Sequence, residues 1–184
     1  MTRIAILGAG PIGLEAALAA AARGDDFTVF EAAAAVGGHV RSWGHVRTFT
    51  PWSMNVSARM RAALPSAPDG AALPTGEQLV AELLEPLAAL PGLRGRIRCA
   101  TRVLAVGREG LLKHEATGEP RRAAAPLRLL AAGPDGREEI VHADVVIDAT
   151  GTYGNSNRLG DGGIDAVNER AFEDRIERFV PDFD

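Results

Sequence analysis

Short apolar runs open the chain and alternate with a stretch of small residues. Residues 4–7 are apolar, residues 14–22 are rich in alanine and leucine, and residues 27–30 form a second apolar run. Two short apolar runs joined by a helical segment are typical of parallel strands connected by a helix. The opening pattern therefore predicts a βαβ unit and an α/β fold.

Three glycines occupy the turn between the first strand and the helix, within the hexapeptide GAGPIG at residues 8–13. Gly8 allows a tight exit from the strand, Gly10 lets the backbone approach a pyrophosphate, and Gly13 lets the helix pack close to the sheet. The first N–H groups of the helix, next to Pro11 and Ile12, would then face the phosphates. GxGxxG alone is weak evidence, because glycines also mark ordinary turns. With a strand before it and a helix after it, it predicts a Rossmann-like dinucleotide site.

Glu31 ends the second apolar run, eighteen positions after Gly13. A carboxylate at this place can accept hydrogen bonds from both hydroxyls of an adenosine ribose. The same charge repels a 2′-phosphate. We therefore expect this site to bind the ADP half of a dinucleotide other than NADP.

Apolar periodicity predicts further elements along the chain. Thr75 and Gln78 can form a capping box at the start of a helix whose apolar stripe extends to Leu87, and Pro86 should kink this helix or end it early. A hairpin is expected around a turn at residues 133–136. The remaining expectations are strands at residues 96–100, 101–106, 127–131 and 138–142, loops at 62–72 and 107–126, and a charged amphipathic helix at 167–179.

Two separated motifs resemble those of the two-dinucleotide-domain flavoproteins. Glu31 is followed by four alanines, a valine and the pair Gly37–Gly38, and residues 144–151 have the sequence DVVIDATG, which ends in Thr150 and Gly151. That superfamily includes flavin-containing monooxygenases, amine oxidases and pyridine-nucleotide-disulfide reductases. The resemblance covers nearly the whole chain and implies FAD rather than NAD. Residues 39–52 look closest to a monooxygenase-like branch.

The same resemblance implies the domain organisation. We expect a single FAD-binding domain over residues 1–184, a Rossmann-like parallel sheet with a small antiparallel β-sheet inserted at about residues 101–142. It also implies that the backbone of Val103 lies beside the adenine ring, although an ordinary core valine is an equal alternative.

Two segments of the resembling families are not found in this sequence. No second GxGxxG motif, which would bind NAD(P)H, follows Gly151, and Gly160-Asp161 lacks the apolar strand that should precede a ribityl-binding Gly-Asp. We therefore expect an incomplete FAD domain without the NAD(P)H domain. It would be a truncated part of a longer enzyme or a chain that needs a complementary polypeptide, inactive when isolated.

Aromatic and basic residues follow Gly38 at alternate positions. These are His39, Arg41, Trp43, His45 and Arg47, which would share one face if the segment were extended. Such a face could meet a flavin or an anionic substrate, and we take His39 and Arg41 as cofactor-binding residues. The alternative is a polar loop anchored in the core by tryptophan. No catalytic residue can be assigned, and the histidine spacing does not predict a metal site.

Composition limits the remaining possibilities. The chain has 184 residues, is 46% hydrophobic and carries a net charge of −4, which favours neither a nucleic-acid nor a membrane surface. Cys99 is the single cysteine, so an internal disulfide and paired redox cysteines are excluded. We expect it to be a buried residue at the start of a strand. No signal-peptide pattern follows Met1, which predicts a cytoplasmic protein.

The sequence thus predicts the FAD-binding part of a flavin-dependent oxidoreductase that resembles the monooxygenases. The family implies a small-molecule substrate, NAD(P)H as electron donor in the complete enzyme, and oxygenation through a flavin peroxide. The alternatives are a non-catalytic dinucleotide-binding module and an NAD-dependent dehydrogenase. Gly37–Gly38 and the lack of a proton-transfer residue for nicotinamide chemistry disfavour the dehydrogenase.

Overall fold

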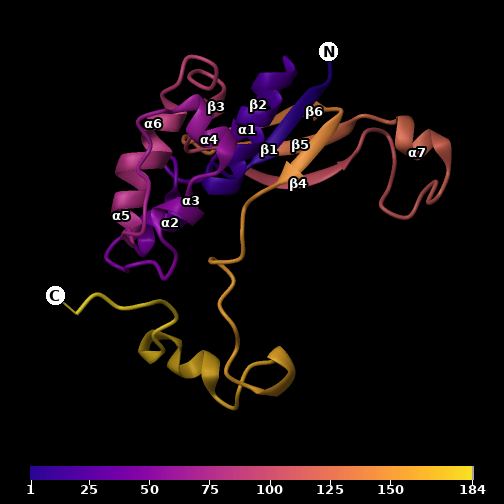
Figure 1. Ribbon diagram of the computed structural model, residues 1–184. Helices are drawn as coiled ribbons and strands as arrows, with labels where there is room; N and C mark the ends of the chain where they lie inside the picture. Colours follow the sequence, from indigo (N-terminus) through magenta and orange to yellow (C-terminus); the bar gives the residue numbers. More distant parts are fainter. Residues whose placement is uncertain (184) are drawn as a thin grey trace.

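A computed structural model, which describes residues 1–183, contains two β-sheets (Figure 1). The parallel sheet has the order β3-β2-β1-β7, with β3 at Ile97–Arg98, β2 at Asp26–Phe30, β1 at Arg3–Leu7 and β7 at Val145–Asp148. The antiparallel sheet has the order β4-β5-β6, with β4 at Arg102–Arg108, β5 at Leu127–Ala132 and β6 at Glu138–Ala143. The predicted Rossmann-like α/β fold with an inserted antiparallel sheet is confirmed.

The βαβ unit forms because its turn residues suit a sharp reversal. Helix α1 (Pro11–Arg23) has a proline in its first turn and ends at Gly24, which adopts a left-handed φ of 71°. Strand β1 lies between β2 and β7, with Leu7 paired to Phe30 on one side and to Asp148 on the other. The carboxyl ends of these three strands therefore meet at one edge of the sheet.

Alternate side chains of β1 divide the core into two layers. Ile6 packs in a cluster with α1 and the helices that follow β2, whereas Ala5 and Leu7 pack with Leu129 and Ala143 of the antiparallel sheet. Figure 1 shows the helices on one side of the parallel sheet and the antiparallel sheet on the other. The helices of this layer are α1, α2 (Gly38–Ser42), α3 (Trp52–Asn55), α4 (Ala58–Ala63), α5 (Gly76–Leu79) and α6 (Glu85–Ala88).

The predicted capping box starts α5. The Thr75 hydroxyl accepts a hydrogen bond from the Gln78 N–H at 3.2 Å, and the Gln78 side chain accepts one from the Thr75 N–H at 2.9 Å. Pro86 does not end the helix, because a π-helical turn at Val80–Leu84 precedes it and the chain continues helically to Ala88. Proline has no N–H to donate to the preceding turn of a helix. In this helix the π turn already breaks the regular i→i−4 hydrogen bonds just before Pro86, so the missing N–H is tolerated.

The segment after Gly38 is not extended, so the condition for a shared face of alternate residues is not met. Gly37 adopts a left-handed φ of 73° and its carbonyl accepts the Arg41 N–H at 2.9 Å, which starts the short helix α2. Helical spacing separates His39 from Arg41, so the alternate residues do not share a face. The prediction for Cys99 is wrong, since it follows β3 and is only partly buried.

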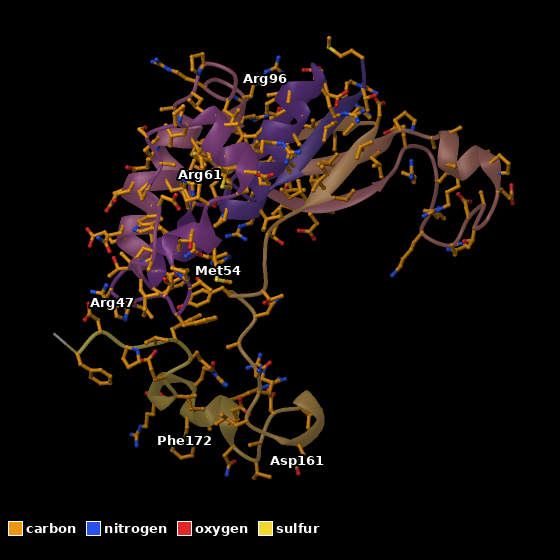
Figure 2. All side chains as sticks on the ribbon, viewed as in Figure 1. Arg47, Met54, Arg61, Arg96, Asp161 and Phe172 are labelled. Carbon is orange, nitrogen blue, oxygen red and sulfur yellow. The ribbon has the colours of Figure 1, made fainter. Side chains whose placement is uncertain are left out.

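The predicted α-helix at residues 167–179 is replaced by a 3-10 helix at Glu169–Arg175 with a kink at Phe172. No core is available there, because Phe172 and Val167 are 49% and 93% exposed. We call residues 152–183 the tail. Figures 1 and 2 show that it lies apart from the two sheets, with Asp161 and Phe172 on its outer parts. Strand β4 ends within the excursion at residues 107–126, which also contains the short helix α7 (Pro120–Ala124). Among residues 1–183 no helix could cross a membrane.

Candidate functional site

A cavity of about 580 Å³ lies where the carboxyl ends of β1, β2 and β7 meet. In doubly wound sheets this edge is where ligands bind. Most of the sequence-predicted site residues line it: Gly8, Gly10, Pro11, Ile12, Glu31, Gly38, His39, Val103, Thr150 and Gly151. Of the other three, Gly13 and Gly37 shape the surrounding backbone, and the structure does not bring Arg41 to the cavity.

The glycine turn closes tightly around β1. Gly8 has a φ of 96°, and a Cβ atom there would lie 2.7 Å from the carbonyl oxygen of Ala149. A Cβ atom on Gly13 would collide with the carbonyl oxygen of Gly8. Gly10 differs, because no atom of residues 1–183 lies within 4 Å of its Cβ position, apart from its chain neighbours. Gly8 and Gly13 therefore allow close packing, whereas Gly10 leaves room at the cavity wall.

Helix α1 begins at this wall. Within the described chain no side chain caps its N-terminus, where Gly10 precedes Pro11. The first N–H groups of a helix have no acceptor inside the helix and carry the positive end of its dipole. Ile12, in the same turn, lines the cavity and is 68% exposed. The arrangement suits a phosphate group in front of Gly10.

Glu31 is 9% exposed, and its carboxylate is hydrogen-bonded to the backbone of the glycine turn even without a ligand. Its carboxylate accepts the N–H of Ala9 at 2.7 Å through Oε2 and the N–H of Ala33 at 2.8 Å through Oε1. A carboxylate offers about four lone-pair sites, so two remain for other donors. The sequence indicated the ligand role of this residue but gave no sign of its backbone contacts.

Gly37 and Gly38 join this network. The Gly37 N–H donates to the carbonyl of Ala9 at 3.0 Å, so Ala9 is bonded on both sides. A Cβ atom on Gly38 would lie 2.5 Å from the Cβ of Ala33 and 3.2 Å from Oε1 of Glu31. The glycine turn, the acid and the glycine pair are thus physically linked through the backbone of Ala9 and Ala33.

The turn at residues 149–151 (Ala-Thr-Gly), which follows β7, closes the cavity on that side. The carboxylate of Asp148 accepts the Thr150 hydroxyl at 2.7 Å and the Thr150 N–H at 3.0 Å, and these bonds hold the pKa of Asp148 below its usual value. Gly151 follows with a left-handed φ of 68°. The Ala149 N–H donates to the Leu7 carbonyl at 2.9 Å, which fixes the turn against β1.

Strand β4 forms the wall near Glu31. Val103 lines the cavity and also packs against the cluster around Leu129, so its position is compatible with both alternatives of the sequence analysis. Arg102 lines the cavity too, and sequence analysis missed it because nothing distinguishes it from the neighbouring arginines. Thr101 is buried, and its N–H donates to the Glu31 carbonyl at 2.8 Å.

The residues after Gly38 separate in space. His39 and Trp43 line the cavity. Arg41 instead braces α2, since its Nε donates to the Val36 carbonyl at 2.9 Å and its guanidinium bonds the Glu85 carboxylate at 2.6 Å. Arg47 donates to the Leu73 carbonyl at 2.7 Å. Across residues 1–183 no cluster of His, Cys, Asp and Glu could hold a metal ion.

Comparisons with known proteins agree with this fold. Residues 6–72 match the NAD(P)-binding Rossmann-like domain family. Bacillithiol disulfide reductase from Bacillus cereus is 20% identical with a TM-score of 0.67, over 86% of this chain and 42% of its own. S-allyl-L-cysteine S-oxygenase from Allium sativum is 18% identical with a TM-score of 0.61, over 82% of this chain and 36% of its own.

A flavin-containing monooxygenase from Stenotrophomonas maltophilia is 24% identical with a TM-score of 0.58, over 87% of this chain and 42% of its own. A search of curated proteins found no match. The chain spans less than half the length of these solved structures. The chain therefore has a Rossmann-like fold that it shares with these solved structures, and residues 6–72 match the model of the NAD(P)-binding Rossmann-like domain.

Proposed function

We propose that the cavity binds FAD and that the chain is the FAD-binding part of a flavin-dependent oxidoreductase of the monooxygenase type. One observation carries the proposal. The glycine turn, Glu31 and the Gly37–Gly38 pair converge on one cavity and are tied together through the backbone of Ala9. A surface turn that only reversed the chain would not need this network.

The residues present fit a dinucleotide. The space at Gly10 and the uncapped start of α1 would receive the pyrophosphate. The two unused acceptor positions of Glu31 would receive the ribose hydroxyls, and Val103 would lie beside the adenine. Bound FAD would supply the electron-transfer chemistry, and the protein would orient it and limit the access of water.

The complete enzyme would oxidise a small molecule with electrons from NAD(P)H. A further domain or a complementary polypeptide would supply the NAD(P)H site and the flavin-side contacts. We expect the isolated chain to bind FAD weakly and to leave NADH and NADPH unconsumed, because hydride transfer requires donor and flavin to be held in reacting geometry.

NAD is the second candidate ligand, favoured by the family that residues 6–72 match. Both ligands contain the same ADP half, which the residues around Gly10 and Glu31 would contact. The two candidates differ in what lies beyond the pyrophosphate, so they are distinguished by comparing each dinucleotide with ADP.

Calorimetric titration of the chain with ADP, FAD, NAD and NADP tests the proposal. We expect ADP and FAD to bind, FAD at least as tightly as ADP, and NAD more tightly than NADP, which differs from it only in a 2′-phosphate that Glu31 would repel. Tighter binding of NADP than of NAD would contradict the role of Glu31. NAD affinity well above FAD affinity would favour the second candidate, and no binding of ADP would overturn the site.

A further inference from the structure

Tyr153 is the single tyrosine of the chain and lines the cavity two residues after Gly151. Its hydroxyl oxygen is enclosed and has no hydrogen-bond partner among residues 1–183. Native proteins rarely leave an enclosed polar atom without a partner, and such atoms commonly mark a functional contact or an unseen ligand. The hydroxyl is therefore unexplained by the folded chain itself.

The ring of Tyr153 lies between two other rings. Its centroid is 5.7 Å from that of His39 and 5.0 Å from that of Phe179 in the tail, with interplanar angles of 55° and 35°. Tilted ring contacts of this kind involve only the aromatic ring and not the hydroxyl. A phenylalanine at position 153 could make the same ring contacts. These contacts therefore account for an aromatic ring at this position but not for its hydroxyl.

The strand order shows which part of a ligand Tyr153 would meet. Glu31 follows β2, the glycine turn follows β1, and Tyr153 follows β7, while β1 lies between the other two strands. A dinucleotide with its adenosine ribose at Glu31 and its pyrophosphate at Gly10 would extend toward the β7 side. Tyr153 would meet the half of the ligand beyond the pyrophosphate.

We propose that the Tyr153 hydroxyl donates a hydrogen bond to a polar atom in the flavin-side half of bound FAD, either the ribityl chain or the ring system. The proposal rests on the proposed function and adds a binding residue to it. Because the hydroxyl is enclosed in this structure, the ring must turn or Phe179 must shift when the ligand enters. Phe179 belongs to the tail and is 45% exposed, so little packing opposes that movement.

The single tyrosine allows a direct test. Incorporation of 3-fluorotyrosine gives one ¹⁹F resonance, from position 153. We expect FAD to shift this resonance strongly and ADP, which lacks the flavin-side half, to shift it little. An equal shift with both ligands, or no shift with FAD while FAD binds, would overturn the proposal.

Tyr153→Phe provides the second measurement. We expect FAD affinity to fall roughly three- to tenfold, which is the loss of one hydrogen bond, with ADP affinity unchanged. The melting temperature of the unliganded chain should not fall, because the variant removes a hydroxyl without a partner. Phe172→Leu, at an exposed ring of the tail, is the control and should change neither affinity.

The outcomes separate this proposal from the proposed function. If the unchanged chain binds neither ADP nor FAD, the proposed function is wrong and the role of Tyr153 falls with it. If it binds both and Tyr153→Phe binds FAD as tightly as before, only the role of Tyr153 is wrong. A lower melting temperature together with an equal loss of ADP and FAD affinity would show a merely structural role.

Discussion

The body of the molecule, residues 3–151, and the tail are stabilised in different ways. The body buries apolar side chains on both faces of β1 and brings backbone segments together at glycines. The tail is organised around Arg178, whose guanidinium bonds the carboxylates of Glu169 at 2.6 Å and Glu173 at 2.7 Å. Many of its large apolar side chains are exposed, namely Leu159, Ile164, Val167, Phe172, Phe179, Val180 and Phe183.

Two oppositely charged side chains at the centre of the tail are enclosed. The side chains of Arg178 and Glu169 are 9% and 0% exposed. Burial alone would raise the pKa of Glu169, but hydrogen bonds from the Ala166 N–H and from Arg178 hold it below the usual value. The apolar pattern thus corresponds to α-helices in the layer that packs on the parallel sheet, whereas at residues 167–179 it corresponds to a short 3-10 helix flanked by ion pairs.

The largest effect is expected in the body at Gly13. Gly13→Val would place a branched side chain against the Gly8 carbonyl, and the helix and the turn cannot both keep their positions. Although Gly is about 1 kcal/mol less favourable than Ala within a helix, this steric conflict outweighs any gain in helix propensity. We expect no cooperative thermal unfolding transition by circular dichroism.

Gly107→Val is the matched control for that change. Gly107 lies in β4, no atom of the described chain beyond its chain neighbours lies within 4 Å of its Cβ position, and valine favours strands. This variant should fold normally. If both valine variants melt like the original chain, the close approach of Gly13 to Gly8 is not needed for folding.

A smaller loss of stability is expected when a buried leucine of the helix layer is shortened. Leu84 is fully buried, and its Cδ1 would lie 3.0 Å from a Cβ on Gly37, so this leucine supports the segment beside the cavity. Leu84→Ala should lower the free energy of unfolding by about 2–5 kcal/mol, measured by urea denaturation. Leu159→Ala, at a leucine in the tail that is 63% exposed, should change it by less than about 0.5 kcal/mol.

Much of the body could be predicted from the sequence because its signals are local. The strand, glycine turn and helix at residues 3–23 follow from apolar runs and turn residues, and the capping box at Thr75 is a pattern of four residues. The cavity residues near Gly10 and Glu31 were found in the same way. Each of these signals agrees with the tertiary contacts that surround it.

Other features could not be predicted because they depend on contacts between residues that are far apart in the sequence. Gly37 turns the chain into a helix, which separates His39 from Arg41, and Arg41 then finds Glu85, more than forty residues away. Arg102 reaches the cavity only because β4 crosses beside it. In the tail, apolar residues recur at helical spacing, but no apolar face is buried there. The spacing alone therefore did not produce the expected α-helix at residues 167–179.

In the tail, the ion pair between Arg178 and Glu169 can be broken without touching the body. Arg178→Met keeps much of the side-chain volume but leaves Glu169 without its cationic partner, so the 3-10 segment should open. Hydrogen exchange of residues 159–178 should accelerate while protection in β1 and β2 stays unchanged. Equal loss of protection in the body would show that the two regions unfold as one unit.

The smallest expected effect is a change in how the melting temperature depends on pH, at Asp144 in the body. Hydrogen bonds from the Arg3 side chain and from the Arg3 N–H lower the pKa of Asp144 from 3.8 to about 2. Because the folded form binds the proton less readily, this contact stabilises the fold above about pH 4 and its contribution is lost as the pH falls toward 2. Asp144→Asn should therefore lower the melting temperature at pH 6 and lower it much less at pH 2.

Asp161→Asn, at an exposed residue of the tail, is the control variant and should leave the melting temperature unchanged. A constant difference between Asp144→Asn and the original chain from pH 6 to pH 2 would mean that the carboxylate charge does not contribute.

If the space at Gly10 receives a pyrophosphate, Gly10→Val should weaken nucleotide binding without changing the fold. Gly10 has extended backbone angles that valine tolerates, and its Cβ position points into open space, so the fold should survive with an unchanged melting temperature. The valine side chain would occupy the place of the phosphate, and ADP affinity measured by calorimetry should fall at least tenfold, or about 1.4 kcal/mol. An unchanged melting temperature together with unchanged ADP affinity would show that the glycine turn only reverses the chain.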